Sequence, residues 1–145
     1  MAVLNLERIQ EQWAEDAPID EHDLVNQALA VPGLHQRWMT YYSTFKLMHS
    51  DATANLSRVT KFKYEYYAGK SPAAVYKEKP FDHKVLKGDL DKYVYADDEW
   101  IKAKQKIDYL ETCLYYIEGV LRQISNRGYT IKNVIDLRKF EAVFL

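Results

Sequence analysis

The fold is decided by residues 100–124, which read WIKAKQKIDYLETCLYYIEGVLRQI. Apolar residues recur along this stretch at spacings of three and four in strict alternation, which gives a period near 3.5. Such a period is typical of a helix that packs against another helix as in a coiled coil. Asp97 or Asp98 can cap the start of this helix, and Gly128 is expected to end it. The apolar positions are Trp100, Ala103, Ile107, Leu110, Leu114, Ile117, Leu121 and Ile124.

The expected partner of this helix is a segment with neither proline nor glycine, which lies between Gly33 and Gly69. Its apolar residues follow mostly alternating spacings of four and three, which predicts a helix of roughly 35 residues. Pro32 suits the first turn of such a helix, and Gly69 suits the position just past its end. Two long helices joined by a connector form an antiparallel hairpin. The apolar positions are Leu34, Trp38, Tyr41, Phe45, Met48, Ala52, Leu56, Val59, Phe62 and Tyr66.

Shorter helices are expected at both ends of the hairpin. The apolar spacing between Leu6 and Asp16 predicts a first short helix, which Pro18 separates from a second one capped by Asp20. Thr130 is expected to cap a C-terminal amphipathic helix with a broad apolar face. A single hairpin leaves this face uncovered, so we expect it to assemble a homo-oligomer. The expected oligomerisation residues are Ile131, Val134, Ile135, Leu137, Phe140 and Phe144.

We interpret the chain as a single all-α domain. Residues 1–31 hold the short N-terminal helices, residues 32–127 form the long hairpin with a connector at 70–96, and residues 128–145 form the oligomerisation helix. The connector is rich in lysine and aspartate and is broken by Pro72, Pro80 and Gly88. Within it, residues 85–86 and 93–95 are compatible with two short strands around the glycine.

The composition narrows the class of protein to which this chain can belong. The chain has 145 residues, with 20 Lys and Arg against 21 Asp and Glu, whereas a dedicated duplex-DNA binder is usually more basic. Residues 1–25 hold seven acids against one base, Arg8. This acidic head either docks a basic partner or a neighbouring copy, or is a solvated face. Cys113 is the single cysteine, and no apolar run resembles a signal peptide or a membrane span, so we expect a soluble intracellular protein.

The sequence offers no motif for catalysis. Its five glycines are isolated, so neither a phosphate-cradling loop nor a dinucleotide fingerprint is present. The four histidines have no metal-ligand spacing. The acids at 97–99 precede a heptad helix, where capping explains them better than catalysis does, and Cys113 is best read as a packed thiol. We therefore expect no enzyme, no metal and no cofactor.

One segment interleaves cations with aromatic rings. Residues 57–70 read SRVTKFKYEYYAGK and set four cations against a single acid, Glu65. Phosphate requires positive charge and an unstacked base requires a flat π surface, so this segment suits single-stranded nucleic acid. Lysines on a helix are also commonly just a solvated face, and a structural coiled-coil protein without nucleic-acid binding stays an open alternative. The cations are Arg58, Lys61, Lys63 and Lys70.

Two segments carry a resemblance to a known family. The run KFKYEYYAG at 61–69 and the tail SNRGYTIKNVIDLRKFEA at 125–142 resemble motifs of the UvsY family, the recombination mediators of tailed bacteriophages. The start of the chain is similar too, and the resemblance extends from about Leu6 to Ala142, with the connector matching weakly. The tail is the more specific of the two motifs.

The resemblance implies an accessory protein without catalysis of its own, in the cytoplasm of the infected bacterial host. Such proteins bind single-stranded DNA that is coated by single-strand-binding protein, weaken that protein's grip, and load a RecA-like recombinase. They act as ring-like homo-oligomers of about six or seven subunits, with the C-terminal region needed for assembly. The family's DNA-contact motif carries over to Lys61 and Lys63, with Tyr67 beside them, and we add Arg58 and Lys70 from the same cationic run.

The motif departs from the family pattern at two positions. Lys63 stands where an arginine is more familiar; lysine still neutralises a phosphate, but it lacks the fork geometry and the stacking of a guanidinium group. Phe62 replaces a small residue, and it either stacks a base or fills the seam of the helix.

Overall fold

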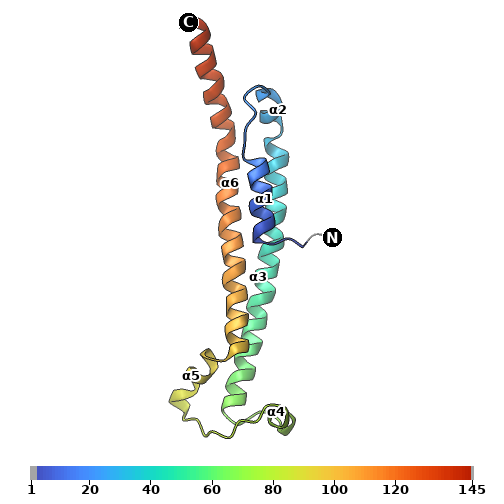
Figure 1. Cartoon of the computed structure of the whole chain (residues 1–145), viewed down its shortest axis with the longest axis vertical. Coiled ribbons are helices and arrows are strands. Elements are labelled where there is room, and N and C mark those ends of the chain that lie inside the picture. The colour runs from blue at the N-terminus through green and yellow to red at the C-terminus, as the bar shows by residue number, and fades with distance from the viewer. Residues whose placement is uncertain (1–2, 145) are drawn as a thin grey trace. The chain divides into compact units, whose positions relative to one another are not determined.

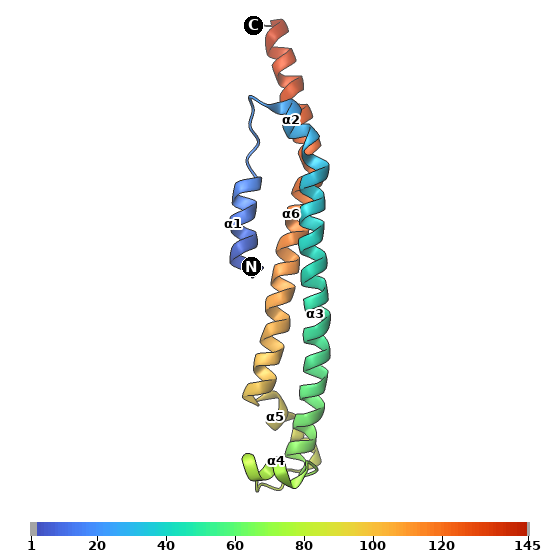
Figure 2. The same cartoon turned by 90° about the vertical axis from the view of Figure 1, so that its right-hand side faces the viewer.

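The computed structural model describes residues 3–144, and within them every regular element is helical (Figures 1 and 2). This confirms the predicted all-α fold. The described residues divide into two compact units. The first comprises residues 3–46 and 112–144, and the second comprises residues 47–111. In each unit a segment of one long helix, α3 (Val31–Tyr67), lies antiparallel to a segment of the other, α6 (Asp98–Phe144) (Figure 1).

The two short N-terminal helices belong to the first unit. Helix α1 (Leu6–Asp16) begins at Asn5, whose side chain accepts a hydrogen bond from the backbone N–H of Arg8 at 2.9 Å. Helix α2 spans Leu24–Leu29. Asp20 does not cap it as predicted, because its carboxylate instead accepts the N–H of His22 in the turn before the helix. The predicted helices are therefore present, and the second one starts later than expected.

Helix α3 (Val31–Tyr67) confirms the first long helix of the predicted hairpin. Pro32 lies in its first turn, where a missing N–H breaks no hydrogen bond. At the other end Gly69 has a φ of +75°, the N–H of Lys70 donates to the carbonyl of Glu65, and the N–H of Gly69 donates to that of Tyr66. These two bonds make a Schellman motif, which ends the helix at the predicted glycine.

The connector contains three short helical elements, α4 (Ala73–Glu78), η1 (Lys87–Asp89) and α5 (Leu90–Tyr95). The prediction of two short strands at 85–86 and 93–95 is wrong. The alternation of tyrosines around Val94 imitates a strand, but in α5 it places Val94 alone inside and both tyrosines toward solvent. A two-stranded hairpin without further strands is marginal in water, whereas one helical turn satisfies its own backbone.

Helix α6 (Asp98–Phe144) is longer than expected. Of the two predicted caps, Asp97 is the one that caps this helix, since its carboxylate accepts the N–H groups of Glu99 and Trp100. The predictions that the helix ends at Gly128 and that Thr130 caps a new one are both wrong, because α6 continues through these residues. Glycine within a helix costs only about 1 kcal/mol, and Thr130 donates to the carbonyl of Asn126 one turn earlier, which a helix tolerates.

Arg127 is therefore an interior residue of α6 and not part of a last turn. Its guanidinium is buried in the first unit, where it donates to the carbonyls of Ala17 and Pro18 at 3.0 Å and to the side-chain oxygen of Gln27 at 3.3 Å. These bonds tie the link between α1 and α2 to α6. The three acceptors compensate for the cost of burying the charge.

Each unit has its own core. In the first unit α1 packs on both long helices, and Trp38 donates its indole N–H to the carboxylate of Asp16 at 3.0 Å while its ring meets that of Trp13 edge-on. In the second unit the indole of Trp100 donates to the hydroxyl of Thr60 at 2.9 Å. The core includes Ile9, Trp38, Phe45, Ile117 and Ile124 in the first unit, and Ala52, Tyr66, Val94, Ile107 and Leu110 in the second.

Two glycine substitutions test these helix boundaries. Gly128→Ala should raise the free energy of unfolding by about 0.5–1 kcal/mol, because the residue is helical and a Cβ there meets nothing within 4 Å. Gly69→Ala should lower it by about 1 kcal/mol, because alanine does not readily adopt a φ of +75°. Urea unfolding followed by circular dichroism measures both. A destabilising Gly128→Ala would mean that the helix does break there.

Candidate nucleic-acid interface

The cation–aromatic segment forms the last turns of α3 and its C-terminal cap, all within the second unit. Arg58, Lys61 and Lys70 are exposed, and the side chain of Lys61 is 79% accessible. Arg58 and Lys61 are three residues apart, so they share one face of the helix. The exposed Glu65 approaches the Lys61 amine only to 4.0 Å, which leaves the amine available to another anion.

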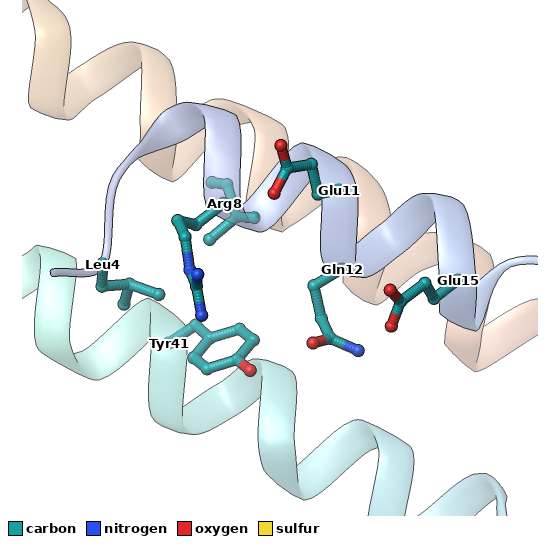
Figure 3. Close-up of a pocket in the computed structure, with 7 residues that line it drawn as sticks. Leu4, Arg8, Glu11, Gln12, Glu15 and Tyr41 are labelled. Atoms are coloured by element: carbon teal, nitrogen blue, oxygen red, sulfur yellow. The ribbon is translucent and has the colours of Figure 1, made fainter. Parts of the chain in front are cut away.

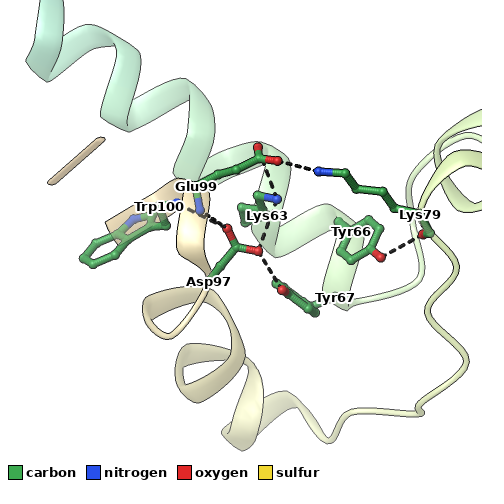
Figure 4. Close-up of polar contacts among 7 residues, drawn as sticks. All are labelled: Lys63, Tyr66, Tyr67, Lys79, Asp97, Glu99 and Trp100. Atoms are coloured by element: carbon green, nitrogen blue, oxygen red, sulfur yellow. Dashed lines mark hydrogen bonds and ion pairs between the residues drawn. The ribbon is translucent and has the colours of Figure 1, made fainter. Parts of the chain in front are cut away.

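Lys63 has a different environment from the other cations. Two residues along a helix turn a side chain by about 200°, so Lys63 points to the inner side, where its side chain is only 5% accessible. Its amine lies 3.1 Å from the carboxylate of Asp97 and 3.4 Å from that of Glu99 (Figure 4). A buried cation is tolerated only when it is paired in this way. Lys63 therefore presents no free amine at this surface.

Asp97 is the centre of this arrangement (Figure 4). One of its oxygens caps α6, while the other accepts the hydroxyl of Tyr67 at 2.7 Å and faces the Lys63 amine. Burial alone would raise the pKa of Asp97, but the hydrogen bonds from Tyr67 and Lys63 hold that pKa below its ordinary value. The same carboxylate thus fixes the end of α3 to the start of α6 within the second unit.

Glu99 extends the ion pairs to the connector. It accepts a hydrogen bond from the Lys79 amine at 2.6 Å, and this bond, with the charge of Lys63, lowers the pKa of Glu99. The hydroxyl of Tyr66 in turn donates to the backbone carbonyl of Lys79 at 2.8 Å. The four charged groups, two lysines and two carboxylates, balance one another, and we call Lys63, Lys79, Asp97 and Glu99 the lysine–carboxylate cluster.

Tyr67, a predicted DNA-binding residue, is half-buried in an aromatic cluster. Its ring centroid lies 5.0 Å from those of Tyr66 and Phe81 and 5.7 Å from that of Tyr93. Burial, together with the hydrogen bond to Asp97, raises the pKa of Tyr67 above its ordinary value, so the phenol stays neutral. The ring therefore packs the connector against α3 and has no open face comparable to that of an exposed ring.

The sequence did not indicate which acids meet Lys63. Asp97 was predicted as a helix cap, and Glu99 as part of the same dipole-complementing run, because spacing along a helix says nothing about a partner over 30 residues away. Lys79 was not singled out at all. The one usable signal was that three acids in a row, Asp97 to Glu99, stand at the start of α6, more than a cap requires.

A hollow of about 170 Å³ lies in the first unit, between α1 and α3 (Figure 3). Arg8, Glu11, Gln12 and Glu15 line it from α1, and Tyr41 lines it from α3. Two acids of the predicted acidic head, Glu11 and Glu15, therefore line this hollow. No feature of the described residues indicates what it would bind.

The predicted oligomerisation residues divide into two groups. Ile131 is buried within its own chain and Val134 is half-buried, so they pack in the first unit. The last turns of α6 extend beyond α2 (Figure 1) and leave their apolar side chains in solvent. The exposed ones are Ile135, Leu137, Phe140, Val143 and Phe144.

Fold and site together define an all-α protein that carries exposed cations at one helix end and an exposed apolar C-terminal helix. No helix within residues 3–144 is apolar over a length that could cross a bilayer. The chain belongs to the family described as the recombination, repair and ssDNA binding protein UvsY, whose model matches residues 12–143. The predicted family is thereby confirmed.

Known members of the family are similar over nearly the whole chain. The recombination protein uvsY of enterobacteria phage T4 is 26% identical over 139 residues, which cover 96% of this chain and 98% of that protein. A crystal structure of the bacteriophage T4 recombination mediator protein UvsY, in lattice type II, has a TM-score of 0.84 at 26% identity and covers 97% of this chain and 99% of that one. Lattice type IV gives 0.82 at 25% identity, with 95% and 99% covered.

Proposed function

We propose that this protein is a recombination mediator that binds single-stranded DNA as a homo-oligomer, helps to displace single-strand-binding protein, and loads a RecA-like recombinase. The observation that carries the proposal is the group of exposed cations along the last turns of α3 and just past its end, in a chain of this family. The role needs no catalysis of the chain's own and no cofactor, and it places the protein in the cytoplasm of the infected host.

The DNA contacts of the proposal are Arg58, Lys61 and Lys70. Their exposed charges neutralise phosphates, which every sequence presents alike, and a mediator must act on any sequence. Lys63 and Tyr67 enter as positioning residues, because the lysine–carboxylate cluster and the aromatic cluster hold them inside. They fix the end of α3, and with it the direction in which Lys61 and Lys70 point.

A few cations per chain do not bind a strand firmly, so the proposal requires several copies. Repeating a weak site within one assembly raises the effective concentration of the second and later contacts, and affinity rises without a large net charge. This accounts for a DNA-binding protein with a formal net charge of −1. The exposed apolar side chains at the end of α6 supply a surface for such assembly. A ring of about six or seven subunits is the proposed form.

The triple variant Arg58→Gln, Lys61→Gln and Lys70→Gln tests the proposed contacts. Its affinity for a single-stranded oligonucleotide should fall, and the dependence of log K on log salt should become shallower by about 0.7 for each phosphate that is no longer neutralised. Fluorescence anisotropy over a salt series measures both, and Lys46→Gln, an exposed cation earlier on α3, is the matched control. Mass determination with and without the oligonucleotide reports assembly in the same samples.

Two outcomes would contradict the proposal in different ways. A triple variant with unchanged affinity and salt dependence would show that the DNA contacts lie elsewhere. A wild-type assembly that binds no single strand even at low salt would favour the alternative, a structural coiled-coil protein without a nucleic-acid role.

A further inference from the structure

A groove of about 190 Å³ opens on the flank of α3 in the second unit, between the end of this helix and α4. Phe62 and Tyr66 line it from α3, and Val75 lines it from α4. Drug-sized ligands need pockets of roughly 300 Å³ or more, so this groove fits one smaller flat group. None of the contacts proposed above for DNA uses it.

Phe62 does not fill the seam of the helix, which was one of the two roles open to it. Its side chain is 42% exposed, although a phenyl ring gains from burial. Successive helix residues turn by about 100°, so Phe62 lies between the solvent side of Lys61 and the inner side of Lys63. Phe62 therefore connects the groove to the part of the helix surface that carries the exposed Lys61.

The charged groups on the inner wall of the groove are already paired with one another or with the aromatic rings. The Lys63 amine lies 5.7 Å from the ring centroids of both Phe62 and Tyr66, so one cation holds the two rings. Glu99 is paired with Lys63 and Lys79, and its charge is offset. Donor groups from Lys79 and acceptor oxygens from Glu78 and Glu99 stand around an apolar centre.

This combination matches an unpaired nucleobase better than a phosphate. A base is flat and apolar on its faces and carries both donors and acceptors on its edge. A phosphate would meet the acid of Glu78 without a dedicated cation, because Lys63 and Lys79 already face Glu99. One nucleotide could then place its phosphate at the Lys61 amine and its base on the ring of Phe62.

We propose that the groove of Phe62, Tyr66 and Val75 takes one unpaired base of the bound strand, stacked on the ring of Phe62. The inference rests on the proposed function and adds a reason for the preference for single strands, since a base in a duplex is not free to leave its stack. The site reads the π face, which all four bases share, so it tolerates any sequence.

The test compares an oligothymidylate with an oligonucleotide of equal length whose nucleotides are abasic. Phe62→Ala should weaken binding of the oligothymidylate about five- to a hundred-fold, the range that stacking on one aromatic side chain contributes. It should leave binding of the abasic strand unchanged, whereas Lys61→Gln should weaken both. Phe62→Trp, which keeps a π face, should bind the oligothymidylate at least as well as the wild type.

Leu47→Ala is the matched control, because Leu47 is 70% exposed on the same helix and lines no part of the groove. Equal affinity of Phe62→Ala and wild type for the oligothymidylate would overturn the base site, as would an equal loss on both strands. An apolar partner side chain in the groove would give the first of these results. Failure of the wild type to bind either strand would instead overturn the proposed function.

Discussion

Replacing Lys63 with methionine will lower the free energy of unfolding by about 3 kcal/mol, because it leaves a buried carboxylate without its cation. Asp97 is only 10% accessible and has no other cation within 4.0 Å among the described residues, whereas the half-exposed Glu99 keeps Lys79. Lys61→Met, two residues away and exposed, should change stability by no more than about 0.5 kcal/mol. Urea unfolding of the two variants makes the comparison.

A double-mutant cycle separates the ion pair from the helix cap. Asp97→Asn removes the charge but keeps a good capping side chain. The stability that it loses should therefore come mainly from the broken ion pair with Lys63. The loss in the double variant Lys63→Met, Asp97→Asn should then be smaller than the sum of the two single losses, since each single change already breaks the pair. Additive losses would show that Lys63 and Asp97 stabilise the fold independently.

The pair also predicts how stability depends on pH. The folded pKa of Asp97 is lower than its ordinary value of 3.8, so the unfolded chain binds this proton more readily than the folded one. The contribution is therefore fully present above the ordinary pKa and is lost as the pH falls through the folded value. Lys63→Met should flatten the decline of stability in this acid range, and Lys61→Met should not.

DNA binding gives an independent readout of the same residue. Under conditions where the variant is folded, Lys63→Met should keep the salt dependence of the wild type, because a cation already paired with carboxylates releases no counterion from DNA. Lys61→Met should make it shallower by about 0.7. A shallower dependence for Lys63→Met would show that the lysine leaves its carboxylates to contact a phosphate.

The long helices could be predicted because their information is local. Apolar periodicity identified both, and a proline in the first turn and a glycine at the end bounded α3 correctly. The same reasoning wrongly predicted that the helix ends at Gly128. A glycine ends a helix only where the tertiary contacts favour a turn. Here they favour a continuous α6, because Arg127 and Ile131 on either side of Gly128 are buried in the first unit.

The site was predicted less completely because its chemistry is not local. The exposure of Arg58, Lys61 and Lys70 agrees with the sequence, which gives no means of telling Lys63 from Lys61 as a DNA contact. That difference depends on Asp97, 34 positions later, and on the fold that brings it to 3.1 Å. Likewise, the sequence does not tell whether Tyr67 or Phe62 has an exposed ring. In the structure Phe81 of the connector packs against Tyr67, whereas Phe62 is exposed.

Charging the end of α6 should dissolve the proposed assembly. Leu137 and Phe140 are 57% and 59% exposed, so the double substitution Leu137→Asp, Phe140→Asp removes little packing within the chain and should leave its helix content unchanged. Two carboxylates per subunit on a shared apolar surface repel one another and resist desolvation. Light scattering should report a monomer for this variant and an oligomer for the wild type. The variant Leu86→Asp, at a 74% exposed leucine in the connector, should assemble as the wild type does.

The same variant should lose about a hundred-fold or more in affinity for a long single strand, because each monomer then binds with its own few cations. Its affinity for a strand short enough to meet one subunit should stay near that of the wild type, since Arg58, Lys61 and Lys70 are unchanged. A monomer that still holds the long strand tightly would show that affinity resides in the single chain. An oligomer of unchanged mass would show that subunits meet through another surface.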